Sequence, residues 1–198
     1  MNVMRELSAQ ALRLTLKPVS RLAGAAMCCV LMAACSPEYD WREVKPEGSR
    51  FAALMPARPA SMTQPINLNG VSADMTLHGA RVREVAFTVG SARLPDALPE
   101  RREHAVAAMR TAMVRNIGGT EQSSRPVSIT VVDAAGVAQG TAAGVEVQAN
   151  GKMRDTEVLL LARFVADGDR AWQAVVLGPR PDREQAALFL ESLRITRP

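Results

Sequence analysis

Apolar and polar residues alternate in several segments of the chain, and this alternation predicts strands. The segments 71–78 and 85–89 alternate without a break, and the apolar residues of 127–131 and 145–147 recur at every second position. A period of two places one side of a strand against the core and the other in solvent. We therefore expect these segments to be strands with one wet face.

Three further segments are predicted to be strands on other grounds. Residues 50–55 form an apolar run that ends at Pro56, and residues 61–68 contain Pro65, which indicates an edge position because proline cannot donate to a neighbouring strand. Residues 158–165 are nearly all apolar, so we expect that strand to be covered on both faces.

Short polar motifs predict where these strands turn. Asn69-Gly70 and Asn150-Gly151 are strong hairpin signals, and residues 167–169 predict a third turn, which leads into a partner strand over 171–177. The glycine-rich segment 136–144 lacks the lysine and the helix start of a phosphate-binding loop, so it predicts a flexible loop.

Two segments have the period of an amphipathic helix. The first covers 98–117, and Gly118-Gly119 ends it. The second begins after Asp182, an expected N-cap with Gln185 three residues later. The order of strands and helices predicts a single α+β domain over 49–198, with an antiparallel sheet covered by two helices.

The first 34 residues predict an export signal. Basic residues precede an uncharged run over 22–34, which as a helix spans roughly 20 Å and is too short for a bilayer core of about 30 Å. The sequence from Leu31 to Ser36 resembles the lipobox of bacterial lipoprotein precursors, with Cys35 as the acylated cysteine. The alternatives are an ordinary secretory signal cleaved near Ala34 and a retained membrane anchor.

The lipoprotein resemblance implies a lipid-anchored protein of the cell envelope. Acyl chains such as palmitate on Cys35 would hold it on a membrane, with 35–48 as a short tether. Ser36 is not the aspartate that signals inner-membrane retention in that family, which implies the periplasmic face of the outer membrane. All three cysteines lie within 28–35, so we expect neither disulfides nor thiolate metal sites in the remainder.

Three segments also resemble the PsbP/DcrB-like group of small lipoproteins. They are 50–56, the hairpin from Arg163 to Val176, and the ending over 189–195. This resemblance implies a PsbP/DcrB-like fold and carries no catalytic residue. Proteins of that group with assigned roles mostly bind or support other proteins, which favours a non-enzymatic role.

Charge and candidate chemistry narrow the function further. The formal net charge is +4, but residues 1–34 contribute four basic residues against Glu6, so the exported part is nearly neutral and nucleic acid is not an expected partner. The two histidines, His78 and His104, fall on the polar faces of separate elements, and we interpret them as surface residues. A ligand role for His78 with Asp74 is the alternative.

The sequence predicts no catalytic residue, metal or cofactor. It lacks a Gly-x-Ser-x-Gly elbow, and Ser91 falls within a predicted strand. We expect a non-enzymatic binding or structural module with an envelope protein as its possible partner. The alternative is an accessory lipoprotein that binds a small ligand or a metal. A ligand binder would show a concave, apolar-lined pocket with convergent polar groups, whereas a protein-binding module would show an exposed apolar patch.

Overall fold

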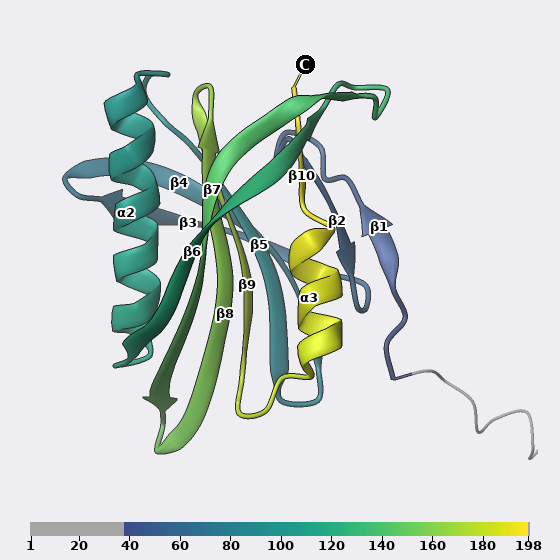
Figure 1. Ribbon diagram of the computed structural model, residues 1–198, viewed down its shortest axis with the longest axis vertical. Helices are drawn as coiled ribbons and strands as arrows, with labels where there is room; N and C mark the ends of the chain where they lie inside the picture. The colour runs from purple at the N-terminus through teal and green to yellow at the C-terminus, as the bar shows by residue number, and fades with distance from the viewer. Residues whose placement is uncertain (1–37, 198) are drawn as a thin grey trace, which may run out of the picture. The chain divides into compact units, whose positions relative to one another are not determined.

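Strands dominate residues 38–197, the part of the chain that this computed structural model describes (Figure 1). Among these residues 57% lie in strands and 17% in helices. The elements, in chain order, are β1 (Arg42–Val44), β2 (Phe51–Met55), β3 (Ala60–Leu68), β4 (Val71–Val82), β5 (Val85–Arg93), α2 (Pro99–Asn116), β6 (Thr120–Val132), β7 (Ala138–Met153), β8 (Thr156–Asp167), β9 (Arg170–Gly178), α3 (Arg183–Glu191) and β10 (Arg194–Thr196).

The ten strands form one curled sheet. Their order is β1-β2-β10-β6-β7-β8-β9-β5-β4-β3. Neighbouring strands are antiparallel except β10 and β6, which are parallel. The proline-containing β3 lies at one edge, as predicted from Pro65, and β2 ends before Pro56 as predicted.

The predicted fold class is wrong. The described residues form a mostly β structure, not a PsbP/DcrB-like α+β fold with an antiparallel sheet covered by two helices. The main physical reason is the curvature of the sheet, since apolar residues from eight strands and from α3 meet in one cluster inside it. The sheet therefore buries much of its inner face against itself, and α3 is one contributor to that face rather than a layer that covers it.

Two clusters of buried residues lie on the two faces of this sheet. The inner cluster contains Phe51, Phe87, Trp172 and Phe189, and α3 packs there. The outer cluster contains Leu160 with residues of α2. The two helices thus lie on opposite sides of the sheet (Figure 1).

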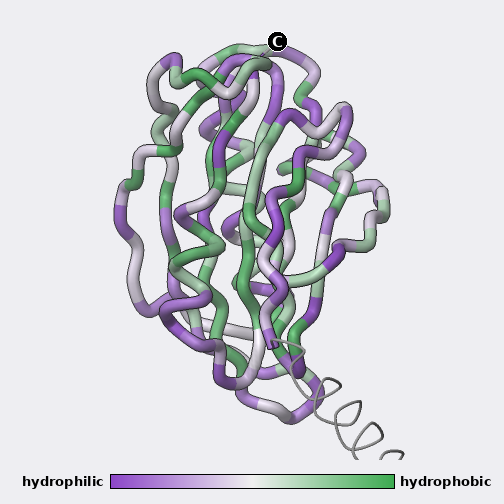
Figure 2. Tube along the Cα trace, turned by 90° about the vertical axis from the view of Figure 1, so that its right-hand side faces the viewer, coloured by the Kyte–Doolittle hydropathy of each residue, from purple (hydrophilic) through white to green (hydrophobic). Residues whose placement is uncertain are grey.

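The strands between the two helices are buried on both faces. Almost every residue of β9 is buried, and so are Val158, Leu160, Ala162, Phe164 and Val165 of β8, as their apolar sequence predicts. Figure 2 shows hydrophobic stretches along strands in the middle of the molecule. The apolar pattern predicts that Val158, Leu160, Phe164, Trp172 and Phe189 share one core. This prediction is wrong, because Val158, Leu160 and Phe164 belong to the outer cluster and Trp172 and Phe189 to the inner one.

Of the two Asn-Gly motifs, one forms the predicted turn and the other does not. Asn69-Gly70 joins β3 to β4 with both residues at positive φ, as predicted. Asn150-Gly151 instead lies inside β7, and the turn falls at Arg154-Asp155. The glycine is explained by a close contact with the end of α2, since a Cβ at Gly151 would lie 2.3 Å from the backbone oxygen of Ile117.

The predicted loop over 136–144 is largely strand. Gly136 lies in the turn after β6, but β7 begins at Ala138 and pairs with β6 from there. Gly144 allows a close approach of β8, because a Cβ at this position would lie 2.8 Å from the backbone oxygen of Phe164. Glycine in this segment therefore permits close strand packing.

Both helices occur where the sequence predicts them. The helix α2 ends before Gly118, which has a φ of +53°. Asp182 caps α3 by accepting from the backbone N–H groups of Glu184 and Gln185. Neither helix of the described part is both long and apolar enough to cross a membrane.

Candidate binding cleft

Three charged side chains form a ladder across the inner face of the sheet. In the strand register Glu146 of β7 lies opposite Arg125 of β6 on one side and Arg163 of β8 on the other. Arg125 Nε donates to Glu146 Oε1 over 2.8 Å, and Arg163 Nε donates to Glu146 Oε2 over 2.7 Å. One carboxylate therefore bridges two guanidinium groups.

Arg163 links this ladder to the end of α3. Arg163 is only 8% exposed, and its Nη1 donates to the backbone oxygen of Leu190 over 3.0 Å. Nη2 lies 4.0 Å from Glu191 Oε1. A guanidinium near a helix C-terminus satisfies a carbonyl that the helix itself leaves unpaired. Arg163 thus positions the helix against the sheet as well as the carboxylate of Glu146.

A cleft of about 200 Å³ lies between these strands and α3. Its lining combines apolar residues such as Leu161 and Leu190 with polar and charged ones. At one end Arg183, the first residue of α3, donates to the side-chain oxygen of Gln148 over 3.0 Å. The lining residues are Ser123, Arg125, Glu146, Val147, Gln148, Leu161, Arg163, Arg183, Ala187, Leu190 and Glu191.

The charges in this cleft favour an acidic group. Three guanidinium groups face two carboxylates, those of Glu146 and Glu191. Arg183 is exposed, and within the described residues it forms no ion pair, since its partner Gln148 is a neutral amide. Arg183 and the exposed Arg125 can each turn a donor toward a carboxylate bound in the cleft.

His78 is not the surface residue that its strand pattern predicts. It is half-buried on β4, its ring packs edge-on against Phe51, and Nε2 lies 3.0 Å from Ser49 Oγ. Burial lowers the pKa of His78 below its usual value of 6.5. The sequence does not reveal this contact, because Ser49 lies 29 positions from His78, in the turn before β2.

The pair of Ser49 and His78 fits a structural contact better than a catalytic one. Ser49 is 3% exposed, and its backbone oxygen accepts from Trp172 Nε1 over 2.9 Å. Covalent catalysis needs an accessible nucleophile and a group that orients the base. No carboxylate partner of His78 appears among the hydrogen bonds of the described residues.

The other candidate residues do not come together. His104 is exposed on α2 as predicted, and Ser91 is buried within β5 with no hydrogen-bond partner for its Oγ. Within residues 38–197 no group of three histidine, cysteine or acidic side chains could hold a metal ion. Cys35, the predicted lipidation site, lies outside the described residues.

The cleft was detectable in the sequence only in part. Arg163 interrupts the apolar run over 158–165, and a charge inside a buried strand requires a partner. That signal could have identified Arg163, but Glu146 and Arg125 depend on the strand register. The register of β7 with β8 in turn depends on the turn at Arg154-Asp155, which the Asn-Gly motif misplaces.

Comparisons with known proteins identify no family. No protein-family model matches the chain, and no curated protein is similar to it in sequence. Among solved structures, the chain is similar to the crystal structure of PA94, a Pseudomonas aeruginosa protein of unknown function. That likeness covers 62% of this chain and 87% of that chain, with 10% identity and a TM-score of 0.36. A likeness this low transfers neither a function nor a site.

Proposed function

We propose that the chain is a lipid-anchored cell-envelope protein whose described part is a non-enzymatic binding module. The anchor is Cys35, and the lipobox-like run before it supports this part of the proposal. The second part depends on one observation, the arginine-lined cleft between α3 and the strands β6, β7 and β8. The proposed location of the protein is the periplasmic face of the outer membrane, as Ser36 after Cys35 implies.

The ligand class follows from the lining of the cleft. A volume of about 200 Å³ suits a small molecule, because cofactors and drug-sized ligands occupy about 300–1,000 Å³. Leu161 and Leu190 offer apolar contacts, while Arg125 and Arg183 offer charged donors. A short organic acid with an apolar chain matches both features.

The exposed apolar residues favour ligand binding in the cleft over docking of a protein on an apolar surface. The large hydrophobic side chains exposed in the described part are Met62, Leu98, Val137, Met153 and Leu188. In the same order, they come from β3, the segment before α2, the turn after β6, the end of β7 and α3. Scattered single apolar residues are normal for a soluble surface, whereas a docking surface needs a contiguous patch.

Calorimetric titration of the full-length protein in detergent micelles tests this proposal. The probe is hexanoate, with hexylammonium as the control of equal chain length and opposite charge. We expect hexanoate to bind and hexylammonium not to bind. In the double variant Arg125→Gln/Arg183→Gln, the dissociation constant for hexanoate should rise by about tenfold or more, because a hydrogen bond to a charged group contributes about 1.5–3 kcal/mol.

A matched variant separates the cleft from the net charge. Arg58→Gln/Arg194→Gln removes the same number of charges at two exposed positions outside the cleft. It should bind hexanoate as the wild type does. Equal binding of hexanoate and hexylammonium, or equal losses in the two double variants, would refute a carboxylate site in the cleft.

A further inference from the structure

Three arginines surround one aspartate at the turn between β8 and β9. Arg50 Nη1 lies 3.5 Å from Asp169 Oδ1, and Arg93 Nε lies 3.2 Å from Asp169 Oδ2. Arg170, the next residue in the chain, lies directly opposite Arg93 in the register of β5 and β9. We call Arg50, Arg93, Arg170 and Asp169 the turn cluster.

The turn cluster holds more positive than negative charge. It contains three guanidinium groups and one carboxylate, and the ion pairs of that carboxylate are with Arg50 and Arg93. The neighbouring Asp167 does not supply the missing charge, because both of its carboxylate oxygens accept from Arg197 over 2.7 and 2.8 Å. Like charges directly opposite each other on paired strands destabilise a sheet, so the pairing of Arg93 with Arg170 has an electrostatic cost.

Arg170 carries a donor that nothing in the described part satisfies. Its Nε is buried and has no hydrogen-bond partner. Burial lowers the pKa of Arg170, and the charges of Arg50 and Arg93 lower it further, while Asp169 acts in the opposite direction. Arginine nevertheless keeps its charge in proteins, so the guanidinium group of Arg170 requires an anion more than those of Arg50 and Arg93 do.

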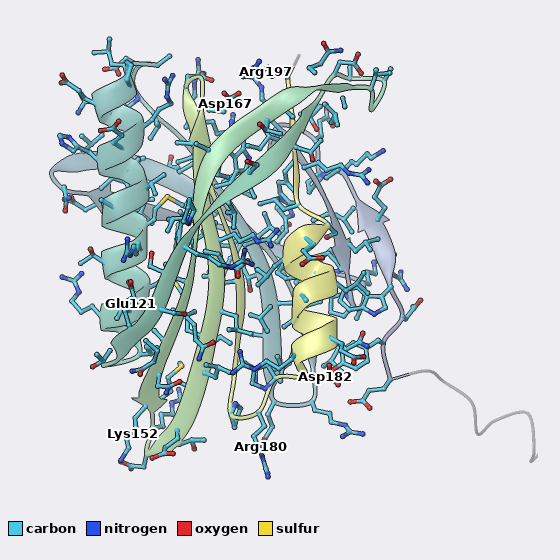
Figure 3. The ribbon with its side chains drawn as sticks, viewed as in Figure 1. Glu121, Lys152, Asp167, Arg180, Asp182 and Arg197 are labelled. Carbon is cyan, nitrogen blue, oxygen red and sulfur yellow. The ribbon has the colours of Figure 1, made fainter. Side chains whose placement is uncertain are left out.

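We propose that the turn cluster binds a phosphate group, at a site separate from the cleft of the proposed function. A phosphate dianion would balance the excess of two positive charges, and its oxygens match the paired donors of guanidinium groups. The turn lies near Asp167 and Arg197, at the opposite end of the molecule from Asp182 and the start of α3 (Figure 3). The phosphate is either a free anion or part of a phosphate-bearing lipid.

Thermal unfolding of the full-length protein with inorganic phosphate tests the free anion. Phosphate stabilises most proteins to some degree, so the informative quantity is the difference between variants. Arg93→Gln is suitable because the Arg93 side chain is 77% exposed and the variant should fold. Its phosphate dissociation constant should rise about tenfold, with a smaller shift in Tm, whereas Arg58→Gln should shift as the wild type does.

The second arm tests the lipid source with the full-length protein reconstituted in vesicles. If the site holds a lipid phosphate, phosphatidylglycerol should raise the Tm of the wild type above its value in vesicles of a galactolipid, which carries no phosphate, and Arg93→Gln should lose this difference. If Arg93→Gln loses the response only to inorganic phosphate, the source is the free anion. If it loses the response only in the vesicles, the source is the lipid. If Arg93→Gln and Arg58→Gln respond like the wild type in both arms, the phosphate site is refuted.

Without phosphate, and at low ionic strength, the variants make an independent prediction. Arg93→Gln should unfold at the same temperature as the wild type or above it, because the substitution relieves the repulsion between Arg93 and Arg170. A clear loss of stability would mean that the ion pair with Asp169 already neutralises the cluster, and would overturn the argument. These readouts do not involve the cleft, so they can fail independently of the hexanoate test.

Discussion

His78 connects the turn before β2 to the inner face of the sheet. Its ring contacts Phe51 and its Nε2 meets Ser49, whose backbone oxygen in turn accepts from Trp172. Alternation places His78 on the polar side of its strand. That side becomes core toward Ala80 and Val82, which are buried in the inner cluster, so the periodic pattern alone could not predict the burial of His78.

The lowered pKa of His78 predicts how stability depends on pH. Burial disfavours the protonated ring in the folded state, so the unfolded chain binds more protons as the pH falls below 6.5. The free energy of unfolding should therefore decrease from pH 6.5 down to the folded pKa. Denaturant unfolding of the wild type and His78→Gln at several pH values measures this. An unchanged pH profile in His78→Gln would contradict the assignment.

At the scale of elements, α3 depends on its cap and on its buried face. Asp182 caps the helix as its sequence predicts (Figure 3). The second half of the predicted capping box does not form, because the side-chain oxygen of Gln185 accepts instead from Trp41 Nε1 over 2.9 Å. A local motif therefore predicts the start of α3, but the tertiary contact with the segment before β1 decides what Gln185 binds.

Phe189 is the main anchor of α3. It is fully buried and packs edge-on against Phe87, with ring centroids 5.5 Å apart. Phe189→Ala should lower the free energy of unfolding by about 3–5 kcal/mol, because it leaves a cavity in the inner cluster. Leu188→Ala, at an exposed position of the same helix, should change it by at most about 0.5 kcal/mol. Equal effects in denaturant unfolding would contradict this packing.

Sequence patterns predict elements in this protein better than their assembly. The two helices, β4 and β5 follow from periodicity, and the doubly buried β8 follows from its continuous apolar run. The Asn150-Gly151 motif fails because its glycine serves a contact with Ile117 at the end of α2, which is remote in sequence. Curvature of the sheet is likewise a property of all strands together, and the periodicity of single segments does not show it. For this reason the α+β prediction was wrong and the cleft could be predicted only in part.

For the whole molecule, the proposed anchor makes a separate prediction. Cys35→Ala should release the protein into a soluble compartment or leave it unprocessed, since acylation needs the thiol of Cys35. Fractionation of cells followed by mass measurement distinguishes these results. A variant that stays on the membrane at the size of the mature wild type would mean that Cys35 is not the anchor.

The central claim, that the cleft beside α3 is a binding site, is tested most directly by NMR. Hexanoate is titrated into the isotopically labelled full-length protein, and backbone amide shifts are followed. We predict that saturable shifts concentrate on β6, β7, β8 and α3 around Arg125, Glu146, Arg163 and Arg183. The absence of saturable shifts, or shifts centred outside these elements, would contradict the claim.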